Sequence, residues 1–270
     1  MGRVSRLLHY DGSDDNFTIW DQKQLETVYV CRVEPASANE VSRVLQVLVD
    51  NWCRFAVKCG GHSRFPDDSV SVGGVTIDLG LMNSTLVSDD KTTARVGGGS
   101  LTRQVFAALD PYGLAYVGGR VGQVGMGGYS LGGGTSALSA KYGWALDHVL
   151  EYEPSVYTGA RTFPDNQTGR FLEEAEKIFT IEDHEDTNIG LEYRTAYALA
   201  NDFIADFQAA AESVNALHPF LYINYADKGQ DVFASYGDEN KQRLVEIQKA
   251  IDPNGVFTSS GLWTGFFKVR

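Results

Sequence analysis

The stretch KCGGHSRFPDDSVSVGGVTIDLG, from Lys58 to Gly80, is the part of the sequence that decides the fold. Residues 55–58 read as a short β-strand that ends at a glycine pair, and His62 follows that pair directly. Glycine permits backbone conformations that other residues resist, and successive peptide N–H groups in such a loop form an anion site. A histidine beside such a loop is placed to reach the ligand that the loop binds.

A second run, GGRVGQVGMGGYSLGGG at 118–134, is more than half glycine and also follows a strand-like segment. Two such loops can cradle opposite sides of one nucleotide cofactor. Neither loop has the spacing of a nucleoside-triphosphate phosphate loop or of the dinucleotide fingerprint of a Rossmann fold, which argues against both. The alternative is that the glycines only form tight turns, and for any single glycine this is the better explanation.

Composition and charge restrict the class of partner. The chain has 270 residues, 43% hydrophobic and 21% charged, with a formal net charge of −12. Nucleic acids and anionic membranes are bound by excess Lys and Arg, so neither is an expected partner. The apolar stretches are too short to span a bilayer. Sequons at Asn16, Asn83 and Asn166 weakly favour export, although the N-terminus lacks the apolar core of a secretory signal.

Three cysteines, Cys31, Cys53 and Cys59, allow at most one intramolecular disulfide. Cys31 and Cys53 bracket a predicted helix, and a bond between them is expected in an oxidising compartment. Cys53, Cys59 and His62 offer three soft ligands, but no fourth lies at zinc-site spacing, so no metal is expected.

The pattern of elements predicts an α+β chain with a strand-rich first half. A capping box, Ser37–Glu40, opens a predicted helix over 38–51, and Asp238 is expected to cap a helix over 238–251. Further helices are expected at 101–110, 169–179 and 193–217. Strands are expected at 27–33, 55–58, 74–79, 92–97, 114–119, 148–153 and 220–226.

The segments FAVKCGGHS, GGVTIDL, ARVGGGS and GGRVGQVGMGGYSLGGGTSALSAKYGWALDHVLEYE resemble the FAD-binding domain of the berberine-bridge-enzyme-like FAD-linked oxidoreductases, which belong to the PCMH-type, vanillyl-alcohol-oxidase superfamily. The likeness is to fungal members. The C-terminal YINYAD and SYGDENKQRLVEIQKAIDPNGVF are similar to the terminal berberine-bridge segment. The resemblance implies an FAD-binding domain at 1–153, a remnant of the substrate domain at 154–217 and a berberine-bridge-like segment at 218–270.

The same resemblance implies roles for single residues. His62 matches the histidine that becomes covalently bound to the flavin 8α-methyl group. Val121 stands where members with a second covalent bond carry cysteine, so a single histidyl link is expected. The implied cofactor-binding residues are Lys58, Gly60, Gly61, His62, Ser63, Gly118, Gly119, Gly122, Val124, Gly125, Gly127, Gly128 and Asn224.

The resemblance places 220–226 near the flavin ring. On a strand, Tyr222 and Asn224 share one face while Tyr225 points to the other. Tyr222 is therefore a catalytic candidate for orienting substrate or supporting proton removal. Tyr225 is a second candidate that packing explains equally well. A phenol titrates near pH 10 in water, about three units too high for a base at neutral pH without help from its surroundings.

Two departures from the family pattern stand out, near Glu153/Pro154 and near Asn188/Ile189, where internal segments of the family are missing. The function implied is FAD-dependent oxidation of a small organic substrate, a secondary metabolite or a carbohydrate, by hydride transfer to flavin with molecular oxygen as acceptor. The deletions favour an alternative, a degenerate non-redox member that acts as a binding or partner protein or as a cofactor-independent metabolite-pocket protein. A third explanation of the two missing segments is that exons were skipped when the gene was assigned, which sequencing of the transcript decides. The oligomeric state stays open.

Overall fold

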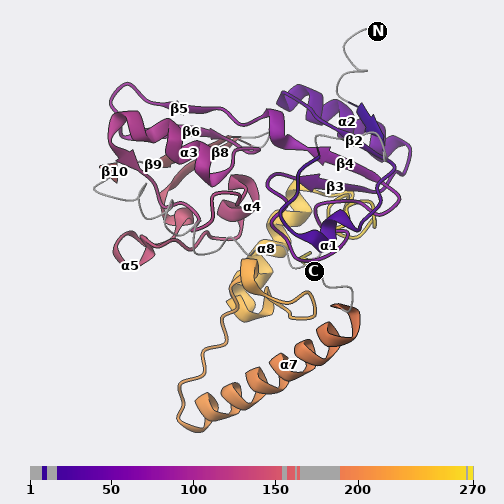
Figure 1. Cartoon of the computed structure of the whole chain (residues 1–270), viewed down its shortest axis with the longest axis vertical. Coiled ribbons are helices and arrows are strands. Elements are labelled where there is room, and N and C mark those ends of the chain that lie inside the picture. The colour runs from indigo at the N-terminus through magenta and orange to yellow at the C-terminus, as the bar shows by residue number, and fades with distance from the viewer. Residues whose placement is uncertain are drawn as a thin grey trace.

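A computed structural model describes residues 8–10, 17–153, 157–161, 163–164, 189–265 and 267–269. Two four-stranded sheets form adjoining lobes (Figure 1). The strands of the first, in spatial order, are β1 (Leu8–Tyr10), β2 (Cys31–Val33), β4 (Val75–Asp78) and β3 (Phe55–Lys58). Those of the second are β5 (Thr85–Val87), β6 (Thr93–Gly97), β9 (Tyr157–Arg161) and β8 (Val149–Glu153).

The first sheet is built on parallel pairs of β4 with β2 and β3, with β1 antiparallel at its edge. Helix α2 (Ala38–Asp50) packs its apolar face on this sheet, and the buried core between them contains Leu48, Phe55 and Ile77. Half of the capping box is confirmed: the Glu40 N–H donates to Ser37 Oγ at 3.3 Å, whereas the Glu40 carboxylate accepts from the Ala36 N–H at 2.8 Å and not from that of Ser37. Amphipathic spacing with a strong cap is therefore enough to define this helix.

The C-terminal end of the chain extends the first sheet. The Phe55 N–H donates to the Leu262 carbonyl at 2.7 Å, and the Thr264 N–H donates back to the Phe55 carbonyl at 3.0 Å. Trp263 thereby forms a parallel bridge with Phe55. The strand β3 leads into residues 59–63, here called the His62 loop. This strand is thus fixed by residues more than 200 positions later in the sequence.

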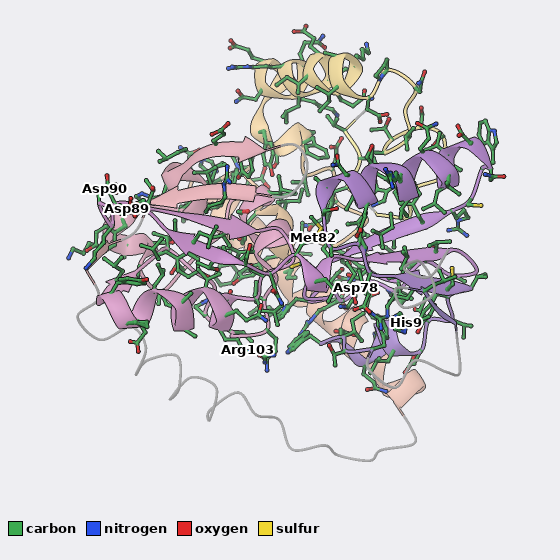
Figure 2. The ribbon with its side chains drawn as sticks, turned by 90° about the horizontal axis from the view of Figure 1, so that it is seen from above. His9, Asp78, Met82, Asp89, Asp90 and Arg103 are labelled. Carbon is green, nitrogen blue, oxygen red and sulfur yellow. The ribbon has the colours of Figure 1, made fainter. Side chains whose placement is uncertain are left out.

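The second sheet is antiparallel throughout and is covered by α3 (Thr102–Leu109). Val96, Val105 and Leu109 are buried in its core. Met82 lies where the two sheets meet, directly after the turn that links β4 to β5 (Figure 2). The remaining short elements of the two lobes are α1 (Gln22–Leu25), η2 (Leu79–Leu81), η3 (Asp110–Tyr112), β7 (Leu114–Ala115), α4 (Met126–Leu131), α5 (Ser139–Tyr142), η4 (Ala145–His148) and β10 (Phe163–Pro164), of which β7 pairs with β10.

The last part of the chain is mostly helical, with α7 (Ile189–Ser213), η5 (Ile223–Tyr225), η6 (Ala234–Tyr236) and α8 (Asp238–Ile251). Helix α7 begins and ends earlier than the predicted range 193–217. Figure 1 shows it as a long orange helix below the two lobes. Its apolar residues Phe203 and Phe207 are 67% and 68% exposed, so they do not join either core.

Several expectations are wrong. The range 220–226 is not a strand, because no strand among the described residues pairs with it and it turns into η5 instead. Asp238 is the first residue of α8 and not its cap, since Gly237 holds the cap position at φ 87°. The predicted disulfide is not formed, and all three cysteines are free. The strands predicted at 27–33 and 114–119 cover only 31–33 and 114–115.

Other expectations fall outside the described residues. These are the helix at 169–179 and the sequons at Asn16 and Asn166. Pro154 and Asn188, each next to a point where a segment of the family is missing, also lie outside the described residues. In the described part of the chain, no helix has the length and apolar character needed to cross a membrane. Within those same residues, no cluster of three or more His, Cys, Asp or Glu side chains is arranged to hold a metal ion.

Candidate functional site

His62 lies in the loop that leaves the end of β3, directly after Gly61, whose φ of 65° is a left-handed conformation. The His62 side chain is partly buried, and its Nε2 has no hydrogen-bond partner among the described residues. Burial lowers the pKa of His62, Arg64 lowers it further, and Asp21 and the residue's own backbone oppose the change. The ring is therefore neutral at pH 7, with a nitrogen not engaged by the described protein.

The two glycine runs contact each other directly. A Cβ on Gly60 would collide with the Gln123 carbonyl oxygen, and one on Gly125 would collide with the Gly60 backbone and lie 2.5 Å from Cys59 Sγ. Both positions therefore require glycine because the two backbones touch. Burial also raises the pKa of the Cys59 thiol, so this side chain stays neutral and fills the space between the loops.

Features at these loops fit a phosphate-bearing cofactor. Among the described residues, the N–H groups of Gly61 and Ser63 have no protein acceptor. A Cβ on Gly128, in α4, would meet no atom within 4 Å, so free space adjoins that backbone. Unpaired donors, open space and an unpartnered His62 nitrogen together are what an FAD molecule held through its pyrophosphate and bound at His62 requires.

A buried ion cluster supports the loop from the sheet. Lys58 Nζ lies 3.0 Å from Asp78 Oδ2, and Arg32 Nη1 lies 3.1 Å from the same oxygen and 2.7 Å from Glu34 Oε1. Figure 2 shows Asp78 within the lobe of the first sheet. Lys58 also donates to the Cys59 carbonyl at 3.1 Å. The Lys58 ammonium is thus engaged by protein groups and holds the start of the loop in place.

The second part of the site comes from the C-terminal segment. The Tyr222 hydroxyl oxygen accepts from the Thr135 N–H and from Asn224 Nδ2, each at 3.0 Å. Asn224 Nδ2 also donates to the Tyr129 carbonyl at 3.2 Å. The Tyr222 ring stands edge-on to Trp144, with centroids 4.8 Å apart. Tyr222 and Asn224 are therefore positioned as a pair, with the Tyr222 hydroxyl proton left to donate.

Tyr225 lies on the same side as Tyr222, contrary to expectation. A 3-10 turn brings residues i and i+3 together, and the two rings are 4.9 Å apart. Arg120 Nη2 donates to the Tyr225 hydroxyl, and Tyr225 is 67% exposed, so it is not a packing residue. The sequence interpretation missed Arg120, although it is the only charged residue in the run 118–134.

Helix α4 connects the two parts. Gly125, at its start, contacts Gly60, and Gly132, just after its end, lies against the Asn224 side chain. A helix of six residues spans about 9 Å, so the His62 loop and the Tyr222 pair lie at opposite ends of a short element. The other implied positions in this run have protein contacts: Gly118 with the Tyr116 ring, Gly119 with Thr102 and Val124, Gly122 with the Arg103 N–H, and Gly127 with the Gly98 carbonyl.

Comparison with protein families places two matches on this chain. The model described as "FAD binding domain" matches residues 30–159, and the model described as "Berberine and berberine like" matches residues 221–260. The first match contains the His62 loop and the second glycine run, and the second contains Tyr222, Asn224 and Tyr225. The part of the site formed by the two glycine runs thus corresponds to an FAD-binding domain.

Curated relatives are fungal enzymes. The FAD-dependent monooxygenase tpcD of Cochliobolus heterostrophus is 34% identical over 61% of this chain and 33% of its own length. The FAD-dependent monooxygenase macF of Penicillium terrestre is 42% identical over 48% of this chain and 25% of its own length. The chain therefore spans about a third or less of the curated relatives it matches.

Solved structures share the fold. The 6-hydroxy-D-nicotine oxidase of Arthrobacter nicotinovorans aligns with 58% of this chain and 42% of its own, with TM-score 0.52 and 26% identity. The glucooligosaccharide oxidase of Acremonium strictum, described with a 6-S-cysteinyl, 8α-N1-histidyl FAD, aligns with 59% and 41%, with TM-score 0.52 and 20% identity. The second likeness is one of fold alone.

Proposed function

Because the chain belongs to the berberine-bridge-enzyme-like FAD-linked oxidoreductases, of the fungal type, we propose that it binds FAD and oxidises a small organic substrate. The observation that carries the proposal is the His62 ring, which is neutral, partly buried and has an unpartnered nitrogen beside two glycine loops. FAD, when bound, supplies the acceptor for a hydride from a substrate carbon. The protein's own contribution is to hold the cofactor and to place the substrate.

The cofactor-binding role of the two loops follows from their arrangement. The N–H groups of 60–63 bind the pyrophosphate, and the backbone of 118–128 lies along the flavin. His62 forms a single covalent link to the flavin, since Val121 offers no thiol for a second bond. Lys58 contributes indirectly, because its ion pair with Asp78 fixes the start of the loop.

The aromatic segment 222–225 handles the substrate. Tyr222, held by Thr135 and Asn224, donates a hydrogen bond that orients a substrate hydroxyl. Removal of the substrate proton is assigned to Tyr225, whose hydroxyl oxygen accepts a hydrogen bond from the Arg120 guanidinium, a cation that would pair with the phenolate form needed to accept a proton. The substrate is a secondary metabolite or a carbohydrate that bears such a hydroxyl, and molecular oxygen takes the electrons from the cofactor.

Flavin attachment is tested with the purified chain incubated with FAD and then precipitated with acid. We expect a yellow pellet for the wild type and a colourless pellet for His62→Ala, because only a covalent bond survives denaturation. A wild-type pellet without flavin, or one that His62→Ala leaves yellow, contradicts the assignment of His62.

Proton removal is tested by Tyr225→Phe, which leaves the ring and removes the hydroxyl. The rate of substrate oxidation by this variant should fall about 100-fold or more at unchanged FAD content. In Arg120→Lys, which keeps the charge but changes the donor geometry, the rate of substrate oxidation should fall less. A Tyr225→Phe enzyme with wild-type turnover contradicts the role of Tyr225 and leaves Tyr222 as the remaining phenol.

A second function is favoured by one observation, the exposed apolar side of α7 with Phe203 and Phe207. A family member that binds a partner or a hydrophobic metabolite without redox chemistry would carry such a surface. Titration of the folded chain with FAD separates the two functions, because a non-redox member would bind its partner or metabolite without binding FAD.

A further inference from the structure

Residues 17–24, here called the strap, lie along the His62 loop and contact it at successive positions. The Phe17 ring lies 5.4 Å from Lys58 Nζ, and Ile19 lies against Gly61, where a Cβ would collide with it. The strap's sequence has neither helical nor strand periodicity before α1, which is why no pattern predicted it. Its path is set by contacts with the loop that follows β3.

The C-terminal end of the strap is anchored through Gln24, which is fully buried. Gln24 Nε2 donates to the Ser63 carbonyl at 2.9 Å, and its Oε1 accepts from the Ser69 N–H at 3.3 Å. Asp21 caps α1 by accepting from the Lys23 N–H at 2.9 Å. The strap therefore has a fixed register on the loop, with anchors on both sides of Trp20.

Trp20 stacks on His62 in that register. The ring centroids are 3.8 Å apart and the planes differ by 10°. Parallel stacking covers one face of the imidazole and fixes the plane of the ring. Trp20 itself is 40% exposed, so burial of the indole in a core does not account for its position.

The stack restricts what the His62 nitrogens can do. Nε2 is buried and has no described partner, so no hydrogen bond to that atom fixes its direction. The ring plane is held by Trp20 instead. The ring is also neutral, because burial lowers its pKa; the charged neighbours are Arg64, which acts in the same direction, and Asp21, which opposes it. A neutral ring of fixed orientation is the form that attacks an electrophilic carbon.

We propose that Trp20 is a positioning residue for covalent attachment of the flavin to His62. The inference rests on the proposed function. In attachment, an imidazole nitrogen forms a bond to the 8α-methyl carbon while that carbon loses a proton and the imidazole loses its N–H proton. The electron pair of the broken C–H bond reduces the cofactor, and molecular oxygen accepts the two electrons and two protons as hydrogen peroxide.

The experiment compares full-length wild type with Trp20→Ala, Trp20→Phe and Trp52→Ala, each incubated with the same excess of FAD in air. Trp52 is 74% exposed and serves as the matched control, since its loss removes an indole away from the strap's contacts. Total bound FAD is measured before acid precipitation and attached FAD after it, over time.

We expect attachment in Trp20→Ala to slow about tenfold or more at unchanged total FAD, because the ring plane is no longer held. Trp20→Phe should restore most of the rate, since a phenyl ring stacks in the same way, and Trp52→Ala should match the wild type. Equal rates in Trp20→Ala and the wild type overturn the proposal. A faster rate in Trp20→Ala also overturns it, because the indole would then obstruct the site.

A second measurement needs no cofactor. Protonated imidazole quenches a stacked indole by accepting an electron from its excited state, so tryptophan emission of the FAD-free chain should drop as His62 gains a proton. The drop should be absent in His62→Gln and in Trp20→Phe. A wild type without this step overturns the stack. A wild type that shows the step but attaches no flavin contradicts the proposed function, and with it the attachment role of Trp20, while leaving the stack itself in place.

Discussion

The His62 loop and the segment 220–225 form the two parts of the candidate site, and they are held in different ways. The loop is fixed by backbone contact with Gly125, by the buried ion cluster around Asp78 and by the strap. The segment is held mainly by contacts of its side chains, with Tyr225 67% exposed. The comparison teaches that the part that corresponds to the FAD-binding family is held by backbone and buried contacts, whereas the segment proposed to contact the substrate is held through its side chains.

The largest effect is expected from a substitution in the buried ion cluster that supports the His62 loop. Asp78→Asn leaves the buried Lys58 and Arg32 without their shared carboxylate, and unfolding free energy should fall by about 3 to 5 kcal/mol. Urea unfolding measures this. The control is Asp231→Asn in the C-terminal segment, whose ion pair with Lys241 is exposed and should contribute nothing measurable. Equal losses in the two variants would show that the ion cluster does not hold the loop.

Three glycines along α4 sharpen the comparison. Gly125→Ala meets the backbone of Gly60, which cannot move aside, and should cost about 1 to 3 kcal/mol and weaken FAD binding. Gly132→Ala meets the end of the Asn224 side chain, which can rotate, and should cost less. Gly128→Ala meets nothing and should be neutral or stabilise the helix by up to about 1 kcal/mol. Melting curves of the FAD-free variants give the order, and any other order contradicts the rigid backbone contact.

The smallest effect concerns pH. In the unfolded chain His62 takes up a proton near its usual pKa of 6.5, whereas burial lowers its pKa in the folded protein. The unfolded state therefore binds more protons below that pH, so the stability due to neutral His62 is present above pH 6.5 and is lost as the pH falls. His62→Gln should flatten the dependence of melting temperature on pH in this range. Identical slopes for wild type and variant would contradict a neutral buried ring.

Local pattern predicted much of the fold. Helices α2 and α8 agree with their predicted ranges within one residue, because apolar residues recur at helical spacing in each. The cap predicted for α2 at Ser37 is present, whereas the cap predicted for α8 at Asp238 is not. The prediction of a strand at 220–226 was wrong because no strand in the described part of the chain pairs with it, and Tyr222 and Asn224 instead hydrogen-bond to a loop and to α4. Helix α7 was predicted from an apolar face that the described structure leaves exposed.

The sequence alone indicated the family, the two glycine loops and His62 as the candidate for flavin attachment, because these are carried by residue types at short spacing. Tertiary structure alone decided that Trp20 stacks on His62, that Arg120 meets Tyr225 and that Lys58 is engaged by Asp78. Each of these contacts joins residues that lie between 20 and 105 positions apart, whereas periodicity records only neighbours within a few turns. Long-range packing therefore sets the geometry that the short motifs leave open.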